Sequence, residues 1–419
     1  MSSKNFFQNN ENLFIIDGCL GNAIFILTTG TILSGYAYLL GANESTISII
    51  VMLPTLMNAV QIFSVRVFQK RSRNKKLLVV NIFLHRFGLG CMFVLPFINI
   101  PAEYKVFMLG LSYGIAYFFY GFVSTGFGDW MLHLVDERKV GKFLGVKDSL
   151  SLLALTITSL IAGKMLDYYE NIGREDIGFL IVGIIVMVMA VMNYLDLKRI
   201  DEVETSVQEI KSNLVQDLIT PFRDVKFRKV IVFYAFWNIA LYMANSFYAI
   251  YMVGYLNLSY FFIMFVNMLS CISRVVASVV WGRLADRISC LWVNRCSVII
   301  LGLSICSWIF VGDSNYMWIL PINQIMAGIA WGGLAITVFN IQFMMAPMDN
   351  KVLYVSVNTA ITSIIGFGAT LVGVQLLEIF PTMIVGGFTI YGIQWVMLLS
   401  GVLMFLVVMY SKLILEKLS

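Results

Sequence analysis

The sequence predicts an all-α integral membrane protein with twelve transmembrane helices, arranged as two six-helix bundles. Of 419 residues, 59% are hydrophobic and only 13% are charged, whereas soluble globular chains carry about 25% charged residues. Apolar runs recur along the chain, and roughly 20 apolar residues suffice for a helix to cross the hydrocarbon core of a bilayer. A water-soluble fold of this size could not bury so much apolar surface.

Six apolar runs precede a polar stretch and six follow it. The first six helices are expected near residues 13–40, 46–67, 77–97, 106–127, 145–165 and 177–197. The last six are expected near residues 230–253, 260–280, 293–311, 317–343, 352–377 and 386–413. The predicted organisation is an N-terminal bundle (1–197), a charged cytoplasmic linker (198–229) and a C-terminal bundle (230–419).

Lys and Arg residues gather in alternate loops. With the N-terminus inside, only Lys105, Lys164 and Arg174 of the 29 basic residues fall in outer loops. Cytoplasmic loops hold an excess of Lys and Arg, so both termini and the linker are expected in the cytoplasm. The net charge of +5 reflects this asymmetry and does not indicate nucleic-acid binding. The first twelve residues lack the pattern of a cleaved signal peptide, and we expect the plasma membrane of a bacterium as the location.

A short motif follows the eighth expected helix, where the chain reads Trp-Gly-Arg-Leu-Ala-Asp-Arg over residues 281–287. It resembles the loop motif of the major facilitator superfamily, Gly-x-x-x-Asp-Arg/Lys-x-Gly-Arg/Lys-Arg/Lys. The resemblance implies a conformational latch at Gly282, Arg283, Asp286 and Arg287. In that interpretation the glycine allows two helices to approach, and the acid lies at a helix start, near the positive end of its dipole. Ser289 and Cys290 depart from the motif.

A faint internal repeat supports the same resemblance. Residues 135–147 after the fourth helix align with residues 346–358 after the tenth, an offset of about half the chain, as two related six-helix halves would give. In the first half, however, Phe68 stands where the motif has its acid.

The family resemblance implies a central cavity lined by helices 1, 4, 7 and 10. Polar and aromatic residues lie there at helical spacing and would offer hydrogen bonds and stacking to a solute. The candidate solute-binding residues are Asn22, Phe25, Thr29, Tyr113, Tyr117, Tyr120, Asn238, Tyr242, Asn245, Arg274, Gln324, Trp331 and Asn358. The alternative interpretation is that these side chains pack between helices or form an interfacial belt.

Charged residues within the spans are functional candidates, since a charge in hydrocarbon costs at least about 2.5 kcal/mol. Asp17 and Arg86 are expected to form a structural ion pair or to take part in coupling. Arg274 either binds an anionic group of the substrate or extends to the membrane surface.

The predicted function is secondary active or facilitative transport of a small polar organic solute, with uptake of a sugar-like metabolite favoured. The alternatives are a proton-coupled exporter of drugs or metabolites and a transporter-like solute sensor. No enzyme motif is present in the sequence, and the six cysteines lack metal-site spacing, so we expect neither catalysis nor a cofactor or metal. The expected partners are the solute, the lipid bilayer and either H⁺, Na⁺ or no ion, and the chain is expected to be a monomer.

Overall fold

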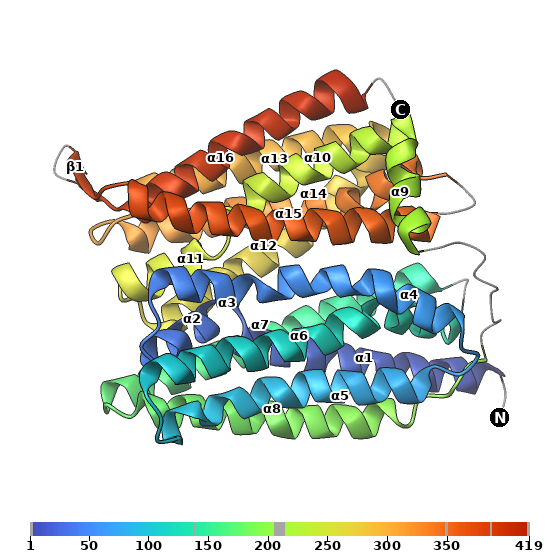
Figure 1. Cartoon of the computed structure of the whole chain (residues 1–419), viewed down its shortest axis with the longest axis horizontal. Helices are drawn as coiled ribbons and strands as arrows, with labels where there is room; N and C mark the ends of the chain where they lie inside the picture. The colour runs from blue at the N-terminus through green and yellow to red at the C-terminus, as the bar shows by residue number, and fades with distance from the viewer. Residues whose placement is uncertain (1–2, 137–138, 205–213, 348–350, 386–387, 417–419) are drawn as a thin grey trace. The chain divides into compact units, whose positions relative to one another are not determined.

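The computed structural model in Figure 1 describes residues 3–136, 139–204, 214–347, 351–385 and 388–416. Helices dominate these ranges, which contain one antiparallel hairpin, β1 (Met383–Val385) with β2 (Phe388–Ile390). Twelve helices of the described chain are long and apolar enough to span a membrane, from Asn9–Leu39 to Gly392–Leu415. The predicted fold class, twelve spans in an all-α membrane protein, is confirmed.

The first six spans are built from the following helices: α1 (Ser3–Thr28) with α2 (Gly30–Leu39), α3 (Glu44–Met57) with the 3₁₀ turn η1 (Asn58–Val60) and α4 (Gln61–Gln69), α5 (Lys75–Cys91) with η2 (Met92–Phe97), α6 (Ala102–His133), α7 (Val140–Asn171) and α8 (Glu175–Leu197). The last six are built from α10 (Val225–Tyr242) with α11 (Phe247–Ile250) and the π turn η3 (Tyr251–Tyr255), α12 (Tyr260–Arg287), α13 (Cys290–Ser307) with η4 (Trp308–Phe310), α14 (Tyr316–Met345), α15 (Lys351–Ile379), and α16 (Gly392–Tyr410) with η6 (Ser411–Leu415).

The expected linker contains a helix of its own, α9 (Leu214–Arg223), which packs on α10 and α15. Asp224 then caps α10, because its carboxylate accepts from the backbone N–H groups of Lys226 and Phe227 at 2.8 and 3.1 Å. An acidic N-cap satisfies donors that a helix start leaves free, so α10 begins at Val225 rather than near residue 230.

The chain divides into two compact units. Unit 1 comprises residues 1–211 and 258–264, and unit 2 comprises residues 212–257 and 265–419. Within unit 1, α1 packs on α7 and α8, and α5 packs on α6 and α8. Within unit 2, α10 packs on α15 and α16, and α13 packs on α14 and α16. The first span of each unit therefore contacts the fifth and sixth, and the third contacts the fourth and sixth.

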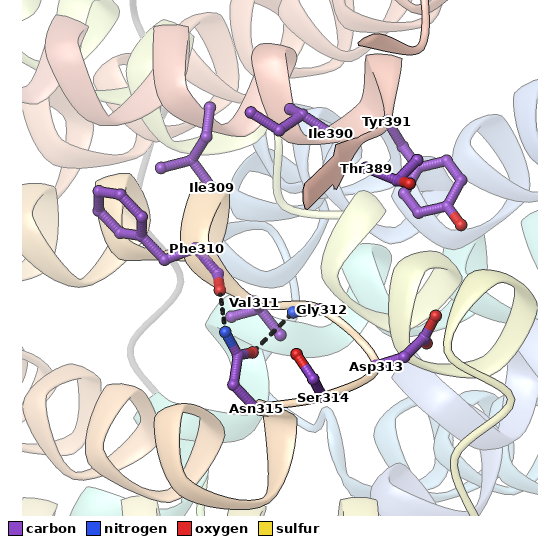
Figure 2. A pocket seen from close by; sticks show the side chains of 10 residues that line it. All are labelled: Ile309, Phe310, Val311, Gly312, Asp313, Ser314, Asn315, Thr389, Ile390 and Tyr391. Atoms are coloured by element: carbon purple, nitrogen blue, oxygen red, sulfur yellow. Dashed lines mark hydrogen bonds between the residues drawn. The ribbon is translucent and has the colours of Figure 1, made fainter. Parts of the chain in front are cut away.

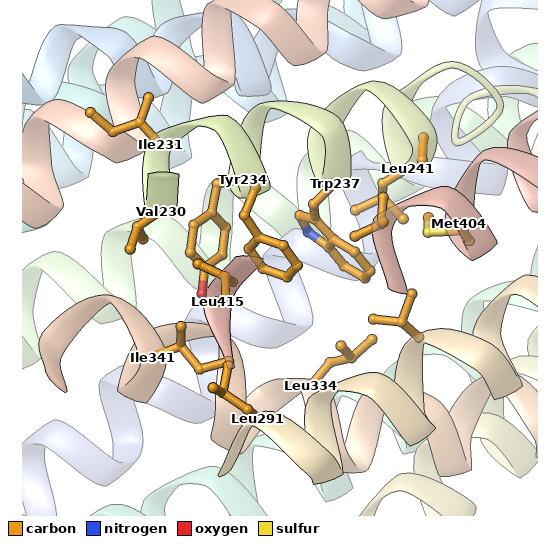
Figure 3. Close-up of a cluster of buried hydrophobic side chains, with 14 of the residues drawn as sticks. Val230, Ile231, Tyr234, Trp237, Leu241, Leu291, Leu334, Ile341, Met404 and Leu415 are labelled. Atoms are coloured by element: carbon orange, nitrogen blue, oxygen red, sulfur yellow. The ribbon is translucent and has the colours of Figure 1, made fainter. Parts of the chain in front are cut away.

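Each unit has its own apolar core. In unit 1 the core includes Phe14, whose ring meets Trp130 edge to face at 5.5 Å. In unit 2 (Figure 3) Val230, Tyr234 and Trp237 of α10 face Leu334 of α14 and Met404 of α16. Where helices must approach closely, glycines supply the space: a Cβ on Gly328 of α14 would clash with the Ser270 carbonyl oxygen of α12. Small residues at such contacts are typical of membrane helix packing.

Candidate functional site: interrupted helices and buried polar clusters

The first span of unit 1 is interrupted beside a predicted solute residue. Helix α1 ends at Thr28, Thr29 is extended (φ −131°, ψ 174°), and Gly30 has a positive φ of 55°. The Thr28 hydroxyl donates to the Ile24 carbonyl at 2.8 Å, and the Thr29 hydroxyl donates to the Phe25 carbonyl at 2.7 Å. These bonds satisfy two carbonyls that precede the break, at a depth in the span where water is scarce.

The first span of unit 2 is interrupted in the corresponding place. Helix α10 ends at Tyr242, a turn occupies residues 243–246, and α11 begins at Phe247. The carbonyl of Tyr242 accepts from the Thr370 hydroxyl of α15 at 2.9 Å, and the Ala240 carbonyl accepts from Ser400 of α16. The interruption thus begins directly after one predicted solute residue, Tyr242, and contains another, Asn245.

The predicted solute residues of unit 1 have different surroundings. Asn22 donates to the Gly18 carbonyl at 3.1 Å, while the Phe25 ring is 51% exposed. On α6, Tyr113 and Tyr117 are buried and their rings meet at 4.8 Å, whereas Tyr120 is 44% exposed. Of the expected tyrosine stripe, only Tyr120 presents much surface.

A histidine of α5 packs against the tyrosines of α6. The His85 ring lies 4.9 Å from Tyr117 and 5.0 Å from Tyr120, and its Nδ1 is 2.9 Å from the Ala116 carbonyl. This neighbour of Arg86 therefore packs against the stripe from α5.

The buried charges of unit 1 meet in one cluster. Arg86 Nη1 of α5 lies 2.8 Å from Asp17 Oδ1 of α1, and Asn193 Nδ2 of α8 donates to the same oxygen at 3.0 Å. Gly21 makes room for the guanidinium, since a Cβ there would lie 2.5 Å from Arg86 Nη2. Asp17 lies about 12 Å into the span that starts at Asn9, at 1.5 Å per residue, deeper than a helix starting near residue 13 would place it.

Two predicted solute residues of unit 2 form hydrogen bonds within that unit. Asn238 donates to the Tyr234 carbonyl at 2.8 Å, and buried Asn358 of α15 donates to Gln342 of α14 at 2.8 Å. Trp331 packs against the core of Figure 3. Arg274 is exposed, and Tyr242, Asn245 and Gln324 are partly buried.

The structure around the predicted latch differs in two respects from what the motif led us to expect. Asp286 lies in the last turn of α12, at the negative end of the helix dipole, and not at a helix start; Ser289 caps the next helix by accepting from Leu291 and Trp292. Among the described residues of its unit, a Cβ on Gly282 would meet only Ile336 Cδ1, at 3.8 Å, so no close helix contact requires this glycine there. Arg283 and Arg287 are exposed.

Two cavities lie apart from the predicted solute residues. One of about 490 Å³ (Figure 2) lies between the 309–315 loop and the end of β2, and Asn315 braces it by hydrogen bonds of 2.8 Å with Gly312 N and Phe310 O. The other, about 810 Å³, is lined mainly by apolar side chains of α3 and α6. No residue of the predicted solute site lines either of these two cavities.

Several buried polar residues were not predicted from the sequence, among them Asn193 and Asp196 of α8 and Gln342 of α14. The available signal was a polar residue inside an apolar run, which at bilayer depth requires a partner. The contact of Asn193 with Asp17 depends on the packing of α8 on α1, two helices far apart in the chain, so the sequence alone does not indicate it.

The twelve candidate spans define a multi-pass membrane protein. The family model of the Major Facilitator Superfamily matches residues 18–371. The chain therefore belongs to this superfamily of membrane transporters.

Solved structures share the fold at low sequence identity. A mutant of the nucleoside transporter NupG aligns with a TM-score of 0.70 at 14% identity, over 97% of this chain and 99% of its own. A POT family transporter in complex with a thioalcohol-conjugated peptide gives 0.71 at 13%, over 97% and 96%. A bacterial homologue of the iron transporter ferroportin gives 0.54 at 14%, over 99% and 100%. Among curated proteins, no sequence matches the chain.

Proposed function

We propose that this transporter takes up a small polar, sugar-like organic solute by alternating access, and that each unit contributes solute-binding groups at the interruption of its own first span. The observation that carries the proposal is that both breaks occur at equivalent places in the two units, after Thr28 and after Tyr242. Interrupted helices in corresponding positions of two repeats are the best structural indication of a transporter binding site.

The chemistry at the breaks suits a solute rich in hydroxyl groups. Thr29, Tyr242 and Asn245 supply hydroxyl and amide groups at the breaks. The exposed Phe25 ring, one turn before Thr29, offers an apolar face. The fold of the nucleoside transporter NupG accommodates a solute that contains a sugar, which is consistent with this class of substrate.

The same proposal includes the orientation of the chain. Both termini lie in the cytoplasm and the protein resides in the plasma membrane, because the loops rich in Lys and Arg alternate with loops almost free of them.

A screen followed by a transport assay tests the function. The purified protein is screened for thermal stabilisation by sugars, nucleosides, amino acids and lipophilic drugs, since a ligand at 100 times its dissociation constant adds about 2.7 kcal/mol. Each stabilising compound is then offered to proteoliposomes. We expect a sugar-like hit whose uptake is lost in Asn245→Ala and retained in Lys412→Gln, a change at an exposed residue outside the predicted site and latch. Stabilisation and transport of drugs alone would show an exporter, and binding without transport would show a sensor.

A further inference from the structure

The end of α8 carries a second buried carboxylate close to the Asp17 ion pair. Asp196 lies one turn beyond Asn193, the residue that donates to Asp17. Asp196 is only 8% exposed, and its Oδ2 atom is buried without any hydrogen-bond partner among the described residues. An ionised carboxylate oxygen with no donor is expensive to bury, so this group needs a cation or a proton.

None of the basic groups around this cluster forms an ion pair with Asp196 among the described residues. Arg86 is committed to Asp17, at 2.8 Å. Lys147 of α7 lies against Gly18 of α1, and it makes no ion pair with either carboxylate in the part of the chain that the structure describes. Arg199 acts on Asp196 from one turn further along, but it is exposed to solvent, where its charge is screened.

The remaining charged and titratable neighbours do not supply a cation. Asp17 acts on Asp196 from α1 with a like charge. His85 of α5 packs among the tyrosines with Nδ1 at the Ala116 carbonyl, and Tyr120 of α6 lies within the field of Arg86 and Asp17. The buried cluster therefore contains two carboxylates and one guanidinium, which leaves one negative charge if both acids are ionised.

We propose that Asp196 is a proton-binding site of unit 1, at which one proton adds to the unpartnered carboxylate oxygen and makes the Asp17–Arg86–Asp196 cluster neutral. The proton comes from water and returns to water, and no covalent bond other than O–H forms or breaks. Within the proposed function, this site is the point at which solute transport is coupled to protons. A sodium ion fits the cluster less well, because Na⁺ requires several oxygen ligands and the Asn193 amide presents its N–H group to Asp17.

Infrared difference spectroscopy of the purified full-length protein tests the proposal without any solute. The probe is the proton alone: spectra are taken as the pH is raised in sodium-free buffer, and the carbonyl band of a protonated carboxylic acid is followed. We expect wild type to show a band that shifts in D₂O and disappears as pH rises. Asp196→Asn should lose the band, and Asp196→Glu should keep it at a shifted frequency. Asp286→Asn, a change at an exposed acid of α12, serves as the matched control and should leave the band unchanged.

Three outcomes would overturn the proton site. The band could persist in Asp196→Asn, which would assign the proton to another acid. It could be absent from wild type at every pH at which the protein is folded. It could also be abolished at constant pH by adding NaCl but not by choline chloride, which would assign the site to Na⁺. If Asp196→Asn fails to fold, the frequency shift in Asp196→Glu still decides the assignment.

This inference rests on the proposed function only for its role in coupling, and the two can fail separately. A band assigned to Asp196 in a protein that moves no solute would retain the proton site and reject the transport proposal. Solute uptake by a protein with no such band would do the reverse. If both hold, a pH gradient should drive solute accumulation in wild type, whereas Asp196→Asn should only exchange solute down its gradient.

Discussion

At the scale of single residues, backbone conformation and buried charge place the sharpest constraints on this protein. Gly30 starts α2 with φ at +55°, and a Cβ at this position would touch nothing within 4 Å. Any effect of a substitution there is therefore an effect of the backbone alone. The Asp17–Arg86 pair is the converse case, because its contribution comes entirely from partners on other helices.

Gly30→Ala should lower stability by about 1 kcal/mol, the cost of holding a residue with a Cβ in the left-handed region. Gly368→Ala is the matched control: this glycine lies inside α15, and its Cβ would also meet nothing within 4 Å. Helical alanine is favoured over glycine by roughly 0.5–1 kcal/mol, so the control should not be destabilised. Thermal unfolding in detergent measures the stability of both variants. Equal changes in stability would show that the positive φ of Gly30 does not make alanine unfavourable there.

Removing either partner of the Asp17–Arg86 pair should destabilise the protein by about 3 kcal/mol, because it leaves one buried charge uncompensated. The double variant Asp17→Asn with Arg86→Gln should recover much of that loss. Unfolding of the two single variants and the double variant forms the cycle. Additive losses would mean that the two side chains, although 2.8 Å apart, do not stabilise each other.

At the scale of helices, the contact of α14 with α12 depends on small residues. A Cβ on Gly328 would approach the Ser270 carbonyl, and one on Gly332 would lie 2.9 Å from the Arg274 carbonyl. Neither backbone carbonyl can move without displacing α12. The glycine of the family motif, Gly282, has no such neighbour.

Gly328→Ala should therefore cost about 1–3 kcal/mol, the usual range for overpacking a core. Gly282→Ala, in the helix that Gly328 contacts, should be nearly neutral. The comparison is made by thermal unfolding and by the yield of monodisperse protein. A neutral Gly328→Ala would show that α12 and α14 pack less closely than their carbonyl positions indicate.

The end of η6 is tied to α13 by an ion pair that responds to pH. Arg295 hydrogen-bonds Glu416 through both Nη atoms, at 2.6 and 3.1 Å, and this bonding holds the pKa of Glu416 below its ordinary value. A carboxyl whose pKa is lowered by folding stabilises the protein above its ordinary pKa and loses that contribution as pH falls through the lowered one. Wild type should thus be slightly more stable than Glu416→Gln near neutral pH, and the two proteins should be equally stable in acid.

The pH dependence of unfolding, measured for both proteins, checks this expectation. The effect should be small, because Glu416 is exposed to water and surface pairs contribute little. In an Arg295→Gln background, the substitution Glu416→Gln should no longer change stability at any pH. A stability difference between wild type and Glu416→Gln that grows as pH falls would contradict the expected sign.

At the scale of the whole molecule, alternating access predicts that residues at the interruptions are reachable from one side of the membrane at a time. Single cysteines at Thr29 and Asn245, in a background with the six native cysteines replaced, should react with a membrane-impermeant maleimide. A stabilising solute should slow labelling. A cysteine at Ser314, which is exposed in the loop of Figure 2 outside the spans, should react regardless of solute. Cysteines at both breaks that react from neither side would contradict the proposed site.

Much of the architecture follows from the sequence because the bilayer is a demanding solvent. Apolar runs of sufficient length must become helices, since no water is available to the backbone, and this requirement determined the twelve spans and the all-α class. It also marked Asp17 and Arg86, because a charge within a span stands out from its neighbours.

Only the tertiary structure decided where the helices break, which glycines meet a neighbour and which polar groups are paired. Thr28 and Tyr242 end their helices inside segments whose mean hydropathy predicts one continuous span, and hydroxyls from distant helices compensate the second break. Gly282 fits the family motif, yet Gly328 makes the close contact. Asp196 became significant only when α8 brought it beside Asp17, because the free energy of a buried charge depends on its neighbours in space and not on its position in the chain.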